Sequence, residues 1–485
     1  MTILEAMGDA VLFRPWFRPW RSWAAWRAFL GALFALPLEG ADLETFQRCT
    51  GREAAPTAPA REAWVIAGRR AGKSRIAALI ATYLAAFRDY SAQLAPGEMG
   101  VVLLLAADTR QARVILRYIR AFFERVPMLA ALVTSQTSET ITLTTGVSIE
   151  VRASSFRTTR GFTVVAAVCD ELAFWYDEDS ANPDREILAA LRPAMATILD
   201  PLLLVVSSPY ARRGELWAAY RRLWGQAVSG MLCWKASTRT VNPLVDAATI
   251  ARAFEEDPAA ASAEYGAEFR TDVEGFLTRE AVEAAVVPGR RELGAAEGRR
   301  YVGFVDPSGG SGDAMTLAIA HSEADRVVID VLEERRPPFA PEAVTADYAS
   351  RLRSYGVGVV TGDAYSGEWV RSAFMKHGVA YRLASLPKSG LYREALPLFN
   401  QGKVELLDSP RLVAQLVGLE RRVARGGRES IDHAPGGHDD LANAVAGVVH
   451  ELAGRRAGRV QVPAEAADLP ERWACASAGM RRGDL

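Results

Sequence analysis

The chain has 485 residues, a length that favours two or three domains over a single hydrophobic core. Its hydrophobic share of 49% and charged share of 24% are typical of a soluble globular protein and exclude a mainly disordered chain. The formal net charge of −1 excludes a globally basic nucleic-acid binder, so any contact with nucleic acid must come from a local basic surface.

The cysteines and the first forty residues indicate where the chain works. The four cysteines form no CxxC pair, which argues against a zinc ribbon or a disulfide framework and favours a reducing cytoplasm. Arginines precede an apolar run at 29–38, a pattern similar to a secretory signal, but prolines, tryptophans and acidic residues interrupt it. The run is also far shorter than the roughly 20 residues that span a bilayer. We therefore predict no signal peptide and no membrane contact.

Residues 1–55 form an N-terminal segment that is rich in aromatic residues and arginine, most clearly in the run RPWFRPW at 14–20. Two interpretations stay open. Aromatic and arginine side chains are favoured in protein interfaces, so the segment could contact another protein. It could equally be a lid that packs on the domain that follows.

Residues 56–235 are predicted to form one α/β domain. Apolar runs predict buried strands at 63–67, 101–106, 164–169 and 202–206. These runs alternate with stretches of helical periodicity such as 109–125, which predicts a mainly parallel sheet covered on both faces. Alternating residues at 140–151 predict an antiparallel hairpin with Gly146 at its turn.

A glycine-bearing loop with the sequence GRRAGKS, residues 68–74, follows the first of these strands and precedes an apolar helix. Lys73 is the sole lysine before position 235, which favours a chemical role for it. In a phosphate-binding loop, Lys73 reaches the β and γ phosphates of ATP and Ser74 binds Mg²⁺. The backbone N–H groups that would cradle the phosphates belong to Gly68, Arg69, Arg70, Ala71 and Gly72. The alternative is a surface turn that caps a helix.

Two further strands of this domain end in polar residues. The strand at 164–169 ends in Asp170 and Glu171. Asp170 would hold the water shell of Mg²⁺, and Glu171 would orient and deprotonate the attacking water. Such a pair also arises by chance, but the loop about 100 residues upstream favours an ATPase. The strand at 202–206 ends in Ser207 and Ser208, which could sense the γ phosphate or form a simple strand-ending turn.

Residues 236–298 are predicted to form a linker or subdomain, residues 299–455 a second α/β domain with a mixed sheet, and residues 456–485 a tail without periodicity. In the second domain, apolar runs predict strands at 302–305, 316–320, 327–331 and 357–361. Helices are predicted near 367–377 and 439–450. No internal repeat is evident.

The second domain has acidic residues at three positions next to predicted strands and helices. Asp306 ends its first strand, Asp363 follows its fourth, and Asp439 and Asp440 open a late helix. If they converge, they could bind two divalent metals, Mg²⁺ or Mn²⁺, that activate water and stabilise the leaving oxygen in phosphodiester cleavage. Aspartate also commonly caps helices, and for Asp439 that alternative stays open. The order of the three positions matches an RNase H-like nuclease.

Together these motifs resemble the large terminase subunit of tailed double-stranded DNA phages and prophages. The resemblance covers about residues 40–450 and rests on GRRAGKS at 68–74, VCDE at 168–171, SSP at 207–209, FRTD at 269–272, GHDDLA at 437–442, and the acidic positions. Two residues depart from the family pattern. Ala67 replaces the first glycine of the phosphate loop, and Asn443 stands where many relatives carry a further acidic residue.

This resemblance implies an ASCE-type P-loop ATPase domain joined to an RNase H-like nuclease. Such a protein drives double-stranded DNA into a procapsid with ATP and cuts the concatemer with divalent metals. It works in the host bacterial cytoplasm as a homo-oligomeric ring on the portal protein, together with the small terminase subunit. The resemblance also implies hydrolysis and coupling roles for Arg69 or Arg70, Ser207 and Ser208, and an adenine contact for Gln47. For the arginines a solvated basic loop is the alternative, and for Gln47 an ordinary helix position.

Three other functions compete with this interpretation. A helicase or repair translocase with a fused nuclease would need a second motor domain, and no second phosphate loop follows position 234. An RNase H-like transposase or integrase would join DNA ends without ATP. A non-enzymatic portal adaptor would show no ATPase activity with Mg²⁺.

Overall fold

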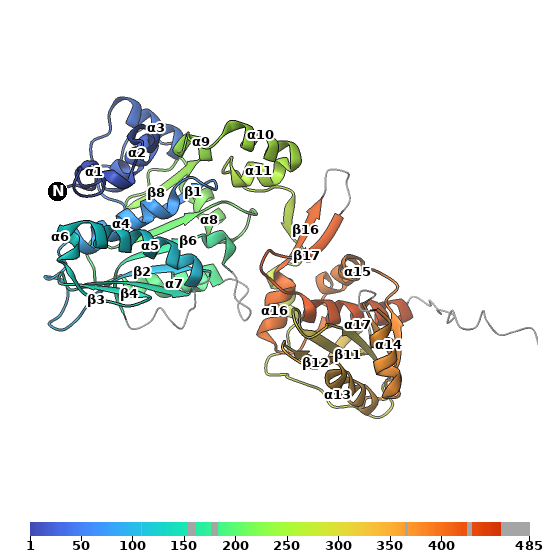
Figure 1. Ribbon diagram of the computed structural model, residues 1–485. Coiled ribbons are helices and arrows are strands. Elements are labelled where there is room, and N and C mark those ends of the chain that lie inside the picture. The colour runs from blue at the N-terminus through green and yellow to red at the C-terminus, as the bar shows by residue number, and fades with distance from the viewer. Residues whose placement is uncertain (108, 154–161, 176–182, 364–366, 424–428, 457–485) are drawn as a thin grey trace, which may run out of the picture. The chain divides into compact units, whose positions relative to one another are not determined.

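The computed structural model describes residues 1–107, 109–153, 162–175, 183–363, 367–423 and 429–456. The chain forms two compact units, shown in Figure 1. The first contains Met1–Ala284 and Asp408–Ala442, and the second contains Ala285–Leu407 and the chain from Asn443 on. The boundaries predicted from the sequence divide the chain into consecutive segments and do not include this interleaving. They remain a prediction. Within the described ranges, no helix is both long and apolar enough to cross a membrane.

The main sheet of the first unit has eight strands in the order β3-β4-β5-β2-β6-β7-β1-β8. Its strands are β1 (Glu62–Ala67), β2 (Gly100–Ala106), β3 (Val133–Gln136), β4 (Thr140–Leu143), β5 (Val147–Ala153), β6 (Thr163–Asp170), β7 (Leu202–Ser207) and β8 (Met231–Ala236). The strands from β5 to β8 in this order run parallel, and β4 and β5 form the predicted antiparallel hairpin. One strand, β7, therefore separates β1, which leads into the glycine-bearing loop, from β6, which ends at Asp170. This is the strand order of ASCE-type ATPases, so the predicted fold class is confirmed.

Helices cover both faces of this sheet because successive side chains of its strands point to opposite sides. On β1, Ala63 and Val65 face the core formed with α4 (Lys73–Phe87) and α5 (Thr109–Arg125). Trp64 faces the opposite core, to which α7 (Pro183–Ala194) and α8 (Gly214–Leu223) contribute. Every residue of β1 is buried, which explains the uninterrupted apolar run in the sequence.

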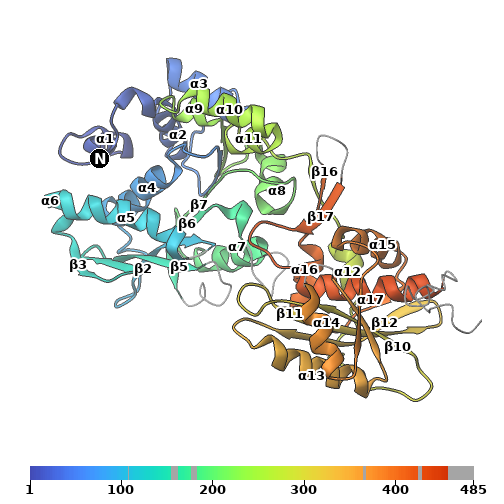
Figure 2. The ribbon, with the colours of Figure 1, turned by 45° about the vertical axis from the view of Figure 1, so that its right-hand side comes forward.

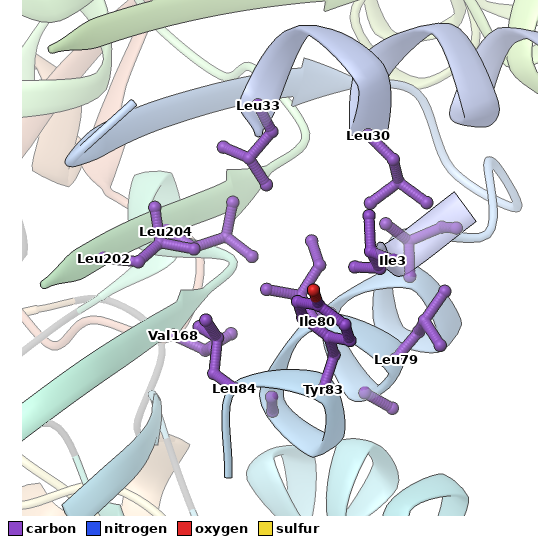
Figure 3. Close-up of a cluster of buried hydrophobic side chains, with 14 of the residues drawn as sticks. Ile3, Leu30, Leu33, Leu79, Ile80, Tyr83, Leu84, Val168, Leu202 and Leu204 are labelled. Atoms are coloured by element: carbon purple, nitrogen blue, oxygen red, sulfur yellow. The ribbon is translucent and has the colours of Figure 1, made fainter. Parts of the chain in front are cut away.

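The N-terminal segment packs on the outer side of α4. It forms α1 (Ile3–Gly8), α2 (Ala24–Leu33), α3 (Gly40–Thr50) and the short 3₁₀ turns η1 (Arg14–Trp16) and η2 (Trp20–Trp23). Figure 3 shows Leu30 and Leu33 of α2 turned toward Leu79 and Ile80 of α4, all in one buried cluster. Trp26 is fully buried as well. Most aromatic residues of this segment are therefore part of the core, which favours the packed lid over a free contact surface.

The first unit also contains several elements outside its main sheet. They are η4 (Leu172–Phe174), α6 (Pro127–Ala130), α9 (Thr238–Val241), α10 (Ala247–Glu256), α11 (Pro258–Glu264), α16 (Pro410–Val417), and the three-stranded sheet β17-β16-β9, formed by β9 (Val273–Gly275), β16 (Leu419–Val423) and β17 (Glu429–His433). The β16–β17 hairpin was not predicted. α12 (Arg279–Ala285) leads into the second unit.

The second unit has a six-stranded mixed sheet in the order β14-β13-β10-β11-β12-β15. Its elements are β10 (Tyr301–Asp306), β11 (Met315–Glu323), β12 (Arg326–Arg335), β13 (Val359–Gly362), β14 (Ala380–Leu383), β15 (Val404–Glu405), α13 (Pro341–Ser354), α14 (Gly367–Lys376) and α15 (Lys388–Asn400), with α17 (Asp440–Arg456) continuing into it. β10, β11 and β12 form an antiparallel meander, and β13 and β14 run parallel to β10. This is the RNase H-like arrangement that the sequence predicted.

Helices also cover both faces of the second sheet (Figure 2). Val305 and Leu317 belong to a buried cluster with α13 and α14. On the opposite face, Gly447 of α17 lies against Phe304, because a Cβ added at Gly447 would lie 2.2 Å from the Phe304 ring. Such close packing requires glycine, which otherwise costs a helix about 0.5–1 kcal/mol.

A buried histidine–aspartate hydrogen bond in this sheet carries a stability prediction. His321 is 1% exposed, and its Nδ1 lies 2.7 Å from Oδ2 of the fully buried Asp330. His321→Leu would leave a buried carboxylate without this hydrogen bond, so we expect the free energy of unfolding to fall by about 1.5–3 kcal/mol. Calorimetric unfolding of the full chain measures the change, and the double variant with Asp330→Leu should recover most of the loss. A His321→Leu single variant as stable as the wild type would contradict this prediction.

Candidate functional sites

The glycine-bearing loop joins the end of β1 to the start of α4. A Cβ at Gly68 would lie 2.3 Å from Thr238 Oγ1 and 2.7 Å from the Glu264 carbonyl oxygen, so position 68 accepts no side chain. Gly72 has a φ of +92° and is the N-cap of α4, without a side-chain cap of its own. The first N–H groups of α4 are thus left for an anion rather than for a capping side chain.

Three side chains from distant parts of the chain hold successive carbonyl groups of this loop. Thr238 Oγ1 donates to the Arg69 carbonyl at 2.8 Å, and Asn242 Nδ2 donates to the Arg70 carbonyl at 2.7 Å. Trp26 Nε1 donates to the carbonyl of the buried Ala71 at 2.7 Å. We call Trp26, Thr238 and Asn242 the loop clamp. Because its donors engage these carbonyl oxygens, the clamp reduces the negative partial charge that an anion at the loop would meet.

Lys73 reaches across the carboxyl ends of three strands. Its side chain is buried, and its Nζ donates to the carbonyls of Ala67 and Gly68, at 2.9 and 3.2 Å, and to Ser208 Oγ at 2.8 Å. The same Nζ lies 3.2 Å from Glu171 Oε1. A single ammonium group therefore connects the loop, the acidic pair after β6 and the serine pair after β7. Ser74 is half-buried in the first turn of α4.

The acidic pair lies where β6 ends. Asp170 is 4% exposed, and burial raises its pKa to about 7; the Glu171 carboxylate adds to the rise and Lys73 opposes it. A buried carboxyl of this kind gains from a bound cation, which offsets the cost of its charge. Glu171 has a φ of +51°. Such a left-handed conformation costs a residue other than glycine about 1–3 kcal/mol and is concentrated at functional sites.

The serine pair after β7 contacts Glu171 directly. The Ser208 backbone N–H donates to Glu171 Oε2 at 2.8 Å, while the Ser207 hydroxyl lies 3.4 Å from the same oxygen. Ser207 Oγ also accepts from the Ala173 backbone N–H at 3.2 Å. The two serines therefore fix the position of the Glu171 carboxylate, which is more than a strand-ending turn requires.

The other residues predicted for this site are arranged less closely. Arg69 is exposed and pairs with Glu264 at 3.2 Å, and Arg70 is exposed with a φ of +60°. Gln47 is exposed on α3, and its Nε2 donates to the Glu53 carbonyl at 2.9 Å. Glu53 lines a cavity together with Met231, the first residue of β8. β8 and β1 run parallel, and the loop follows the end of β1, so this cavity and the loop lie at opposite edges of the sheet. The adenine contact of Gln47 stays a prediction without support from this geometry.

In the second unit, Asp306 and Asp363 lie at the carboxyl ends of neighbouring parallel strands. Val305 pairs with Gly362, so the next residue on each strand is one of the two aspartates. Neighbouring strands are about 4.8 Å apart, which is close enough for two carboxylates to share a cation. The Tyr381 hydroxyl donates to the Asp363 carbonyl at 3.1 Å. Burial raises the pKa of Tyr381, and the charges of Asp306 and Asp363 raise it further, as expected if both lie nearby.

The third predicted acidic position belongs to the first unit. Asp440 is the first residue of α17, and Asp439 precedes it with only 5% exposure. Asp439 gathers with Asp432 and His433 of the β16–β17 hairpin, with one ligand atom from each within 4.8 Å of the others. Because Asp306 and Asp363 belong to the second unit, the convergence of all three positions stays a prediction.

Both sites suit a hard divalent cation by their chemistry. Hydroxyl and carboxylate oxygens, as offered by Ser74 and Asp170 or by Asp306 and Asp363, are the ligands that Mg²⁺ and Mn²⁺ prefer. Beside Asp306, the amide oxygen of Asn443 is buried and has no hydrogen-bond partner among the described residues. Such an acceptor beside a carboxylate is expected where a hydrated cation binds, because the cation or its water would be the missing partner.

The sequence did not predict the loop clamp, Asp432, His433 or Tyr381. Thr238 and Asn242 lie about 170 residues beyond the loop in the chain and carry no motif of their own. The pair Asp432 and His433 offered a weak signal, since adjacent acidic and histidine residues close to GHDD at 437–440 are compatible with metal binding.

No family model matches the sequence, and no curated protein matches it. Among solved structures, the large terminase of bacteriophage HK97 covers 81% of this chain and 91% of its own, with a TM-score of 0.37 and 16% identity. The large terminase of a thermophilic bacteriophage, in complex with ADP, covers 83% and 96%, with a TM-score of 0.38 and 11% identity. The magnesium-bound large terminase nuclease of thermophilic phage G20c covers 35% and 95%, with a TM-score of 0.32 and 16% identity. All three are phage large terminases or parts of one. At such low identities and scores, function has to be inferred from this chain's own residues.

Proposed function

We propose that this chain is a DNA-packaging motor and nuclease, the large terminase subunit of a tailed phage or prophage. The observation that carries the proposal is the presence of two separate oxygen-rich sites in one chain. One is the contact of Lys73 with Ser208 and Glu171 at a phosphate loop. The other is the in-register placement of Asp306 and Asp363 on an RNase H-like sheet.

At the first site the residues can divide ATP hydrolysis among themselves. The loop N–H groups and Lys73 bind the β and γ phosphates, and Ser74 and Asp170 would hold Mg²⁺, which neutralises phosphate charge. Glu171 accepts a proton from the attacking water. Ser208 contacts both Lys73 and Glu171. If a γ phosphate draws Lys73 away, Ser208 and Glu171 both lose their contact with the Lys73 ammonium group. This gives Ser207 and Ser208 a coupling role. Arg69 and Arg70 remain candidates to stabilise transition-state charge.

At the second site Asp306 and Asp363, with Asp439 or Asp440, would hold two divalent metals, Mg²⁺ or Mn²⁺. Such metals supply an activated water and charge stabilisation of the leaving oxygen in phosphodiester cleavage. The protein's own part is to hold the carboxylates in place. Asp306 is held by the pairing of β10 with β13, and Asp363 by its carbonyl bond with Tyr381.

The same function implies double-stranded DNA as substrate, with a portal protein, a small terminase subunit and further copies of this chain in a ring as partners, all in the cytoplasm of the infected bacterium. A helicase needs a second motor domain, but the second unit is built on an antiparallel meander. A transposase needs no phosphate loop, whereas in this chain the lysine of such a loop, Lys73, contacts the proposed catalytic Glu171.

The proposal is tested with purified full-length chain, double-stranded DNA, ATP and Mg²⁺ or Mn²⁺. We expect ATP hydrolysis that double-stranded DNA stimulates, and metal-dependent cutting of supercoiled plasmid without unwinding of a forked duplex. Strand unwinding would favour the helicase. Joining of DNA ends without ATP would favour the transposase, and a lack of ATPase activity would favour an adaptor.

The loop clamp gives a further prediction. The double variant Thr238→Val, Asn242→Ala removes two hydrogen bonds to the loop, each contributing about 1 kcal/mol. We expect the KM for ATP to rise by about 10- to 30-fold in a steady-state ATPase assay, with plasmid cutting unchanged. Thr45→Val is the matched control, since the Thr45 hydroxyl donates to the Ala41 carbonyl within its own helix and not to the loop. An unchanged KM would show that the clamp does not position the loop.

A further inference from the structure

Asn443 lies over the end of β10 because of how α17 packs. Gly447 brings the helix against Phe304. One helical turn earlier in α17 is position 443, and two residues further along β10, on the same face of the strand, is position 306. The packing of Gly447 on Phe304 thereby places Asn443 next to Asp306.

The amide nitrogen of Asn443 has a hydrogen-bond partner, whereas its amide oxygen has none among the described residues. Nδ2 donates to Asp306 Oδ2 at 2.8 Å, which fixes one oxygen of that carboxylate. Oδ1 is buried without a hydrogen-bond partner among the described residues, and the whole residue has no exposed surface. Exchanging the two ends would set Oδ1 against the carboxylate oxygen, so the Asp306 bond fixes the orientation. A buried unsatisfied acceptor costs about 1–3 kcal/mol, which needs an explanation.

We propose that Asn443 is a positioning residue of the nuclease site, holding Asp306 through Nδ2 and offering Oδ1 to the hydrated divalent cation that Asp306 and Asp363 bind. This inference rests on the proposed nuclease function and deepens it. Amide oxygens are suitable partners for hard cations, and a neutral amide keeps the site less negative than an aspartate would. A bound cation would give this oxygen the partner that it lacks among the described residues.

The test uses the full-length chain with Mn²⁺ alone, followed by calorimetric titration and by thermal unfolding. Asp306→Ala identifies the heat and the unfolding shift that belong to this site. We expect Asn443→Leu, which is similar in size but apolar, to weaken Mn²⁺ binding by about 10- to 100-fold and to lose most of the Mn²⁺-induced rise in Tm. Its metal-free Tm should change little, because removal of the unsatisfied buried oxygen offsets the loss of the hydrogen bond to Asp306. Asn400→Leu, at an exposed site in the same unit, is the control.

Asn443→Asp separates a role toward the cation from a structural one. A second carboxylate beside Asp306 should lower the metal-free Tm through repulsion and enlarge the rise that Mn²⁺ produces. Unaltered Mn²⁺ binding in Asn443→Leu would overturn the inference about Asn443 alone. If Asp306→Ala binds Mn²⁺ as the wild type does, both the inference about Asn443 and the nuclease assignment fail.

Discussion

Replacing Lys73 with alanine is expected to lower the rate of ATP hydrolysis by about 100- to 1,000-fold while plasmid cutting persists. The ammonium group is buried among the loop carbonyls, Ser208 and Glu171, so its removal leaves these groups without their shared cation. A preorganised charge of this kind typically contributes a factor of about 10² to 10³ to the rate. Release of inorganic phosphate with Mg²⁺ and double-stranded DNA measures the loss.

Lys403→Ala is the matched control for this experiment, since Lys403 is partly exposed in the second unit and pairs loosely with Asp325 at 3.6 Å. Lys403→Ala should unfold at the temperature of the wild type, and thermal unfolding of Lys73→Ala checks that this variant is still folded at the assay temperature. If Lys73→Ala hydrolysed ATP at the wild-type rate, the loop would not be the nucleotide site.

Asp306→Ala is expected to have the opposite effect, with cutting reduced by more than about 100-fold and ATP hydrolysis retained. Loss of groups that only orient metal ligands already costs about 10- to 100-fold, and a ligand carboxylate should matter more. Asp306 and Asp363 are adjacent in register, so the loss of either leaves one carboxylate where two are needed. Nicking and linearisation of supercoiled plasmid in Mn²⁺ measure the effect.

Asp325→Ala provides the comparison, because 71% of that side chain is exposed. Asp325 lies in the turn between β11 and β12, at the other end of the sheet from Asp306, since Asp306 pairs with Thr316 near the start of β11. The variant should cut at the wild-type rate. Normal cutting by Asp306→Ala would remove the second sheet from the nuclease assignment, whatever the ATPase assay shows.

The sequence was sufficient to predict features that depend on local order in the chain. Apolar runs that end in polar residues predicted the strands, and the carboxyl ends of parallel strands share one edge of a sheet. That rule places the acidic pair and the serine pair at one edge of the first sheet, and Asp306 and Asp363 at one edge of the second. The observed strand pairing then brings Glu171 beside Ser207 and Asp306 beside Asp363. The glycine displaced to position 68 is also explained, because the contact with Thr238 leaves no room for a side chain there.

Features that depend on contacts between distant segments could not be predicted. Trp26 and Asn242 hold neighbouring loop carbonyls, yet neither carries a sequence signal for that role. For the aromatic and arginine-rich start of the chain, the sequence left an interface and a packed lid equally open. The structure favours the lid, since α2 presents an almost wholly apolar surface that is buried with α4. Asn443 looked like a departure from the family pattern, and only its contact with Asp306 suggests a function.

The most direct test of the two proposed sites is anomalous diffraction from crystals grown with Mn²⁺ and a non-hydrolysable ATP analogue. Two separate groups of Mn²⁺ peaks are expected. One should lie beside Ser74 and Asp170 with the γ phosphate at Lys73, and the other between Asp306 and Asp363. A nucleotide bound away from the loop, or no Mn²⁺ at the Asp306 and Asp363 carboxylates, would contradict the two-site function.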